Sequence, residues 1–151
     1  MAAIYKGLPI PLYAALIDLQ KAFDSIRRDQ LFGLLTKHQF PISAINLVKM
    51  LYQNENSALV LNRNRSNNWS VNKGVRQGAS SSPLLFNLFP EELLTRIRTY
   101  EGISFDGVHL NALFYADDLI LMADTPEQRQ TLLGVMEKWA QDFDLAVNVD
   151  K

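Results

Sequence analysis

Two adjacent aspartates, Asp117 and Asp118, interrupt an otherwise apolar stretch, FYADDLILMAD at 114–124. A buried ionised carboxylate is costly unless it is paired, hydrogen-bonded or bound to a metal, and neighbouring carboxylates also repel each other. A third acid, Asp18, directly follows the apolar run YAALI at 13–17. If the two segments are neighbouring strands, the three carboxylates converge at one edge of a sheet, where divalent cations would offset their repulsion.

Such a carboxylate group could catalyse phosphoryl transfer, because two divalent ions about 3.5–4 Å apart can clamp the attacking and leaving oxygens. The chain has no cysteine and only two histidines, His38 and His109, so its ligands would be oxygens, which suit Mg²⁺ or Mn²⁺. The alternative is a solvated Asp-Asp turn beside an unrelated surface Asp18. The residue types and spacing alone favour that alternative.

The composition is typical of one folded domain, with 151 residues, 48% hydrophobic and 21% charged, and we expect a single domain over residues 1–151. An apolar run of membrane-spanning length and a signal-peptide pattern are both absent from the sequence. These features predict a soluble, intracellular protein, nuclear or cytoplasmic, that is not secreted and has no membrane partner. A net charge of −1 gives no overall signal for nucleic-acid binding.

The charge distribution is more informative. Residues 56–90 contain no acidic residue, and this stretch carries Arg63, Arg65, Lys73 and Arg76 around Trp69. A basic, polar segment with an aromatic residue is suited to phosphate contact. The alternative is a solvated hairpin with scattered basic residues.

Hydrophobic periodicity and turn signals predict alternating strands and helices. The expected strands are 13–19, 58–62, 68–72, 109–116, 119–123 and 145–149. The expected helices are 25–38 with Asp24 as N-cap, one from Pro41, one from Ser82-Pro83 to Ile97 that is kinked or divided at Pro90, and one after a capping box at Thr125–Gln128. This order predicts an α+β fold with a mainly antiparallel sheet and helices packed on one face.

Four segments resemble, in order, the palm motifs of reverse transcriptases of the non-LTR (LINE-type) retrotransposon branch: ALIDLQKAFDSI (15–26), GVRQGASSSPLLFNLF (74–89), FYADDLILMAD (114–124) and LAVNVDK (145–151). The resemblance implies a polymerase palm with a ferredoxin- or RRM-like sheet. It implies an RNA-directed DNA polymerase, a nucleotidyltransferase that adds deoxynucleotides to a primer 3′-OH on an RNA or DNA template. It also implies two Mg²⁺ or Mn²⁺ ions.

The resemblance assigns roles to individual residues. Asp18 and Asp117 would bind both metals, Asp118 would complete the acidic triad, and the carbonyl of Leu19 could add a ligand. Phe23 would lie under the sugar of the incoming nucleotide and exclude a 2′-hydroxyl; the alternative is a phenylalanine of the core.

Further positions match the nucleotide and nucleic-acid contacts of the family. Gln77 and Gly78 would lie along the nucleotide and template. Arg76 would contact phosphate or template, or instead form a surface salt bridge, and Tyr115 would lie near the primer end or pack into the core. Lys151 would act as general acid toward pyrophosphate, and Arg63, Arg65 and Lys73 would add contacts to nucleic acid.

The family's fingers precede these motifs and its thumb follows them, so we expect a palm-centred fragment without most of the fingers and without the thumb. Two other functions remain open. One is a catalytically silent palm fragment that binds nucleic acid or self-associates through the exposed fingers and thumb docking surfaces. The other is a metal-dependent nuclease that uses the same acids.

Overall fold

The computed structural model describes residues 2–4, 11–105 and 107–148. The elements in chain order are β1 (Ala2–Ile4), β2 (Tyr13–Asp18), α1 (Ala22–Ser25), α2 (Arg28–Lys37), α3 (Ile42–Tyr52), β3 (Asn56–Ser57), β4 (Val60–Leu61), β5 (Asn64–Arg65), β6 (Trp69–Ser70), α4 (Ser82–Ile97), β7 (Ile103–Phe105), β8 (Val108–Leu110), β9 (Ala112–Tyr115), β10 (Asp118–Ala123) and α5 (Pro126–Asp142). Helices and antiparallel strands are therefore mixed, as the sequence predicts. In the described part of the chain no helix is long and apolar enough to cross a membrane.

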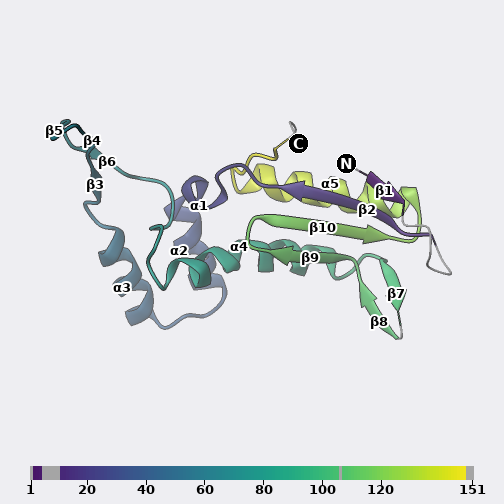
Figure 1. The fold of residues 1–151 in the computed structure, drawn as a ribbon. Coiled ribbons are helices and arrows are strands. Elements are labelled where there is room, and N and C mark those ends of the chain that lie inside the picture. Colours follow the sequence, from purple (N-terminus) through teal and green to yellow (C-terminus); the bar gives the residue numbers. More distant parts are fainter. Residues whose placement is uncertain (1, 5–10, 106, 149–151) are drawn as a thin grey trace.

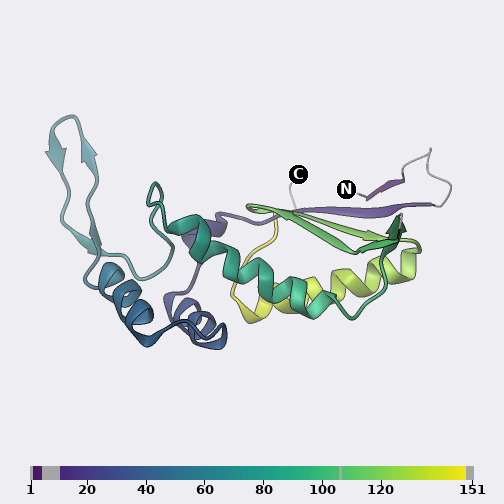
Figure 2. The same ribbon diagram turned by 90° about the horizontal axis from the view of Figure 1, so that it is seen from below.

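A four-stranded antiparallel sheet in the order β1-β2-β10-β9 lies in one half of the molecule (Figure 1). Helices α4 and α5 both lie on one side of this sheet (Figure 2), which confirms the prediction of helices on one face. Because side chains alternate across a strand, one set faces the helices and the other remains uncovered. Ile17, Leu119 and Leu121 belong to the buried set.

The uncovered face of the sheet keeps large apolar side chains in contact with solvent. Leu16 on β2 is 54% exposed and Leu113 on β9 is 49% exposed. Between them on β10, Ile120 lies opposite both Leu16 and Leu113. These three side chains therefore form one apolar row on the face opposite α4 and α5.

The segment between α1 and α4 extends beyond one end of the sheet (Figure 1). It contains α2, α3 and a hairpin of short strands in which β3 pairs with β6 and β4 pairs with β5. In Figure 2 this hairpin rises on the side of the sheet that α4 and α5 leave uncovered. The hairpin confirms the prediction for 58–72, although its turn, at Asn62 and Arg63, is shorter than NRNRS and its strands are interrupted.

Asp24 is not an N-cap, so that prediction is wrong. It lies inside the short helix α1, and α2 begins only at Arg28 after the extended residue Arg27. The expected helix 25–38 is interrupted because the backbone N–H groups of Gly74 and Val75 donate to the carbonyls of Ile26 and Phe23, respectively. Those carbonyls are then committed to a distant segment, which no local periodicity reveals.

Three other expectations differ from the structure. Helix α4 continues through Pro90 to Ile97, so proline does not divide it. The first part of the expected strand 109–116 belongs to a separate hairpin, β7 with β8. The expected strand 145–149 reduces to one bridge between Leu19 and Val147 within the described residues, and position 149 lies outside them.

The start of α5 matches its sequence signal. The Thr125 side chain accepts from the backbone N–H of Gln128, and the Gln128 side chain accepts from the backbone N–H of Thr125. This capping box satisfies donors that the first helical turn leaves without partners. It anchors α5, whose buried Trp139 donates to the carbonyl of Phe89 at 3.1 Å and so ties α5 to α4 beneath the sheet.

Candidate functional site

Two aspartates face each other across the central strands. Asp18, the last residue of β2, is directly opposite Asp118, the first residue of β10, and Asp118 is also opposite Tyr115 of β9. Cross-strand partners lie on the same face of a sheet, so these three residues form a row beside the apolar row of Leu16, Ile120 and Leu113. Like charges directly opposite each other destabilise a sheet. The pair therefore indicates a role other than stability.

Asp117 lies in the turn that joins β9 and β10. Tyr115 pairs with Asp118, so the two turn residues are Ala116 and Asp117, and Asp118 belongs to the strand rather than to the turn. Ala116 has a φ of 54°. This left-handed conformation is energetically unfavourable for any residue other than glycine. The carbonyl of Asp117 accepts from the backbone N–H of Leu19 at 3.2 Å. The turn is thereby held against the end of β2, next to Asp18.

Asn148 is a site residue that the sequence analysis did not identify. Its side-chain Nδ2 donates to the Asp18 carboxylate Oδ2 at 2.9 Å, and its backbone N–H donates to the Asp18 carbonyl at 2.8 Å. The signal was present, since Asn148 belongs to LAVNVDK, one of the four segments that carry the resemblance. An asparagine gives no sign by itself that it will reach a carboxylate 130 residues away.

The donor chemistry of this edge fits a hard divalent cation, because carboxylates are the ligands that Mg²⁺ and Mn²⁺ prefer. The side chains as they stand do not complete such a site. Among residues 2–4, 11–105 and 107–148, no three His, Cys, Asp or Glu side chains are grouped so that they could hold a metal ion. The backbone register brings Asp18 and Asp118 together, and the Asp117 carbonyl lies against the backbone of Leu19.

The residues expected at the nucleotide lie beside this edge. Phe23 is half-buried and stacks on Phe86 of α4, with ring centroids 4.5 Å apart and planes 11° apart. The Gln77 side chain donates to the Asp24 carboxylate at 2.9 Å. The first contact joins the segment after β2 to α4, and the second joins it to the segment before α4.

Gly74 allows these two segments to approach. Its φ is 84°, and a Cβ built there would lie 3.1 Å from the backbone of Asp24 and 3.2 Å from that of Phe23. Only glycine fits both the left-handed conformation and the close approach without strain. Gly78 has the same φ, with open space around it.

Arg76 forms a salt bridge with Glu55 at 2.9 Å, and its Nη2 donates to the carbonyl of Leu51. The salt-bridge alternative is thus what the structure shows for its guanidinium, and a contact with nucleic acid stays a prediction. Arg28 binds the same carboxylate and also donates to the carbonyls of Val71, Gly74 and Tyr52. Its guanidinium lies 4.8 Å from the centre of the Tyr52 ring.

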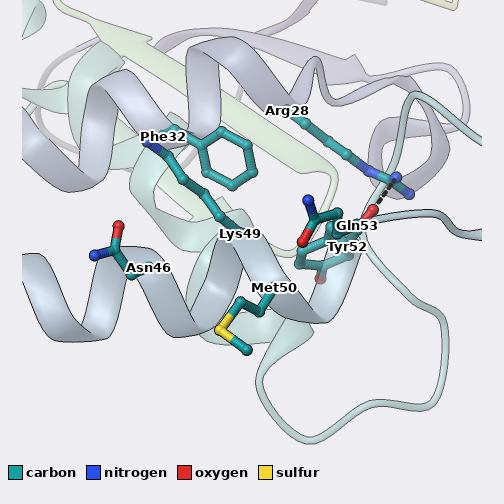
Figure 3. Close-up of a pocket in the computed structure, with 7 residues that line it drawn as sticks. All are labelled: Arg28, Phe32, Asn46, Lys49, Met50, Tyr52 and Gln53. Atoms are coloured by element: carbon teal, nitrogen blue, oxygen red, sulfur yellow. Dashed lines mark hydrogen bonds between the residues drawn. The ribbon is translucent and has the colours of Figure 1, made fainter.

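Arg28 and Tyr52 also line a hollow of about 590 Å³ between α2 and α3 (Figure 3). The Lys49 ammonium lies 5.5 Å from the centre of the Phe32 ring in its wall. The exposed side chains Ile42, Leu47 and Met50 lie on the same helix, α3. Of these three, Met50 also lines the hollow.

The other predicted site residues are placed as follows. Tyr115 is 84% exposed, so it does not pack into the core. Leu19 is buried, and its backbone lies against the Asp117 turn. Arg63 and Arg65 are exposed on the hairpin, and Lys73 pairs with Asp144 at its base. Lys151 lies outside the described residues.

The family described as reverse transcriptase (RNA-dependent DNA polymerase) matches residues 9–151. The chain is 33% identical over 131 residues to a Pol polyprotein of the R2 retrotransposable element of Nasonia vitripennis, covering 87% of this chain and 13% of that protein. It is 31% identical over 139 residues to the Drosophila melanogaster R2DM polyprotein, covering 92% and 13%. The chain therefore spans about an eighth of the length of these relatives.

A solved apo telomerase from Candida tropicalis has a similar fold, with a TM-score of 0.56 and 16% identity over 95% of this chain and 30% of that one. The described chain therefore shares its fold with that telomerase. The chain belongs to the reverse transcriptase family, in the branch of the non-LTR (LINE-type) retrotransposons.

Proposed function

We propose that this chain is the palm-centred part of an RNA-directed DNA polymerase that extends a primer 3′-OH with deoxynucleotides on an RNA or DNA template. The opposed pair of Asp18 and Asp118 on the uncovered sheet face, with the Asp117 turn beside it, carries this proposal. The fold does not require two carboxylates opposite each other. Their presence fits a site that binds positive charge. The family and the telomerase-like fold support the same activity.

In this proposal Asp18 and Asp117 would hold two divalent ions, and Asp118 and the carbonyl of Leu19 would be further oxygen donors. When bound, the ions would activate the primer hydroxyl and neutralise charge on the leaving pyrophosphate. Asn148 orients the Asp18 carboxylate through the hydrogen bond that its side-chain amide donates to Oδ2. Lys151, beyond the described residues, is proposed as the general acid.

The neighbouring residues would select and align the substrates. Phe23, kept in place by its stack on Phe86, would close the space under the sugar to a 2′-hydroxyl. Gln77 and Gly78 would lie along the nucleotide and template. The exposed Tyr115 would lie near the primer end. Nucleic-acid phosphates would be contacted by Arg63, Arg65 and Lys73. Arg76 would replace its salt bridge to Glu55 with a contact to a phosphate.

Primer extension by the 151-residue chain with Mg²⁺ or Mn²⁺ tests this function. We expect extension that Asp117→Asn reduces by two orders of magnitude or more, because charge stabilisation is the main catalytic contribution to phosphoryl transfer. The matched control is Glu137→Gln, which removes an exposed carboxylate from α5 on the other side of the sheet. Equal activity of the two variants would refute the proposal.

A catalytically silent module is the second candidate, since the chain covers only 13% of its R2 relatives. It predicts nucleic-acid binding without extension, unchanged by Asp117→Asn, or self-association through apolar surfaces such as Ile42, Leu47 and Met50. Sedimentation at high concentration measures self-association directly. Shortening of the labelled primer would instead indicate a metal-dependent nuclease.

A further inference from the structure

Asp24 belongs to the segment 15–26 but not to the row of acids at the sheet edge. It lies in the short helix α1, and its carboxylate is exposed. The side-chain Nε2 of Gln77 donates to this carboxylate at 2.9 Å, across 53 positions of the chain. The segments that carry Phe23 and Gln77 are thus joined by side chains as well as by backbone.

The backbone brings Asp24 beside the segment before α4. The N–H of Val75 donates to the carbonyl of Phe23 at 2.9 Å. A Cβ at Gly74 would lie 3.1 Å from the Cα of Asp24, so the missing side chain leaves room for this approach. These contacts bring Asp24 within reach of Gln77 without help from the bond between the two side chains.

The backbone on either side of Gln77 is held separately. The buried hydroxyl of Ser82 donates to the carbonyl of Arg76 at 2.5 Å, and the N–H of Ala79 donates to the same carbonyl at 3.3 Å. Gly78, next in the chain, has open space around it. The backbone position of Gln77 is therefore fixed by these bonds, and the direction of its side chain is set by Asp24.

The chemistry of the two groups allows one orientation of the amide. A carboxylate accepts hydrogen bonds and cannot donate them, whereas an amide carries both an acceptor oxygen and a donor nitrogen. The bond to Asp24 therefore turns the NH₂ group of Gln77 toward α1 and leaves Oε1 directed elsewhere. Because the bond is exposed and competes with water, it contributes little to the stability of the fold.

We propose that Asp24 is a positioning residue for the polymerase reaction, which fixes the Gln77 amide in one orientation toward the incoming deoxynucleotide. This rests on the proposed function, in which Gln77 lies along the nucleotide. Oε1 and the second N–H of Gln77 remain for the substrate, which then meets an acceptor and a donor already in place. Without Asp24, part of the binding free energy is lost in ordering the amide. The effect therefore falls on the KM for the nucleotide.

Steady-state incorporation of a single deoxynucleotide tests this assignment. Asp24→Asn should raise KM by about three- to ten-fold, the range of one hydrogen bond, and leave kcat nearly unchanged, because an asparagine accepts or donates and permits both amide orientations. Asp29→Asn, which alters an exposed aspartate of α2 bound by Arg27, is the matched control and should change neither constant. A lower thermal midpoint of Asp24→Asn, with kcat reduced as KM rises, would show a structural role and overturn the proposal.

A double-mutant cycle tests whether Asp24 acts through Gln77. In a Gln77→Ala chain, Asp24→Asn should raise KM no further, because the side chain that Asp24 orients is already gone. An equal rise in both backgrounds would mean that Asp24 acts without Gln77, and the proposal would be wrong.

The amide of Gln77 also provides a measurement that needs no activity. In a proton–nitrogen correlation NMR spectrum its side-chain signals are the pair that Gln77→Ala removes. Asp24→Asn should shift this pair, and so should a deoxynucleoside triphosphate added to the original chain with primer and template. The absence of either shift would overturn the proposal, whether or not the chain extends primers. Lack of extension with both shifts present would refute only the proposed function.

Discussion

Asn148 donates two hydrogen bonds to Asp18, one from its side chain to the carboxylate and one from its backbone to the carbonyl. The first restricts the carboxylate rotation, and the second ties the segment after α5 to the end of β2. Two segments that are 130 residues apart in the chain thus define the position of one acid. The site depends on the chain after α5 as well as on the sheet.

Asn148→Ala should therefore impair the proposed reaction without removing any charged group. Partners that orient a metal-binding side chain typically account for about 10–100-fold in activity or metal affinity, and we expect a loss of that size in extension rate. Raising the Mn²⁺ concentration should restore part of it. Asn87→Ala, on the exposed side of α4, is the matched control. Similar rates for both variants would mean that Asn148 has only a structural role.

Phe23→Val should relax the choice of sugar. Removing the ring opens space under the nucleotide. One extra or missing methylene group in a pocket discriminates by about 10–200-fold, so the ratio of ribonucleotide to deoxynucleotide incorporation should rise by at least ten-fold. Single-nucleotide incorporation assays measure that ratio. Phe32→Val, a half-buried phenylalanine of α2, should leave it unchanged. Loss of all extension without altered selectivity would favour a purely structural Phe23.

The sequence predicted the elements of the sheet better than the contacts between its motifs. Short continuous apolar runs identified β2 and β10, and the placement of Asp18 at a strand end followed from the run before it. The interruption between α1 and α2 was not predictable, because carbonyls of Phe23 and Ile26 bond to residues 74–75. Periodicity reports on local burial, and these bonds depend on a segment about 50 positions away.

The contribution of Arg28 to stability was also not predictable from the sequence, because it depends on distant contacts. In the sequence it is one of two adjacent arginines, yet Arg27 is exposed at 45% while Arg28 is only 11% exposed and binds Glu55 and several carbonyls. Removing one partner of a buried ion pair typically costs about 3–5 kcal/mol, so Arg28→Ala should lower the unfolding free energy by about that amount. Urea denaturation measures it.

Arg27→Ala provides the control for Arg28, with an expected change of at most about 1 kcal/mol for a surface pair. Hydrogen exchange should also show loss of protection at residues 71–76 in Arg28→Ala, since its donors hold that segment. Equal destabilisation by the two alanine variants would contradict this assignment.

The Arg27–Asp29 pair predicts a small pH-dependent contribution. The hydrogen bond from Arg27 to the Asp29 carboxylate lowers the pKa of Asp29 below its ordinary 3.8. Because the pKa is lower in the folded state, the stabilisation is present above pH 3.8 and is lost as the pH falls through the folded-state value. Asp29→Asn should thus be slightly less stable at pH 7 and equal to the original chain in strong acid. In 1 M salt, where the screening length is about 3 Å, the difference should become smaller.

The turn at Ala116 places Asp117 beside Leu19 at the expense of backbone strain, since its φ is 54°. Ala116→Gly should relieve that strain and raise the unfolding free energy by up to about 1 kcal/mol, while extension activity is kept. Ala116→Val should do the reverse, because a β-branched residue tolerates this region worst. Ala112→Gly, in the strand of the same hairpin, should instead destabilise by about 0.5–1 kcal/mol, so thermal denaturation separates the two glycine variants by sign. If Ala116→Gly destabilises as Ala112→Gly does, the left-handed turn is not the conformation that holds Asp117.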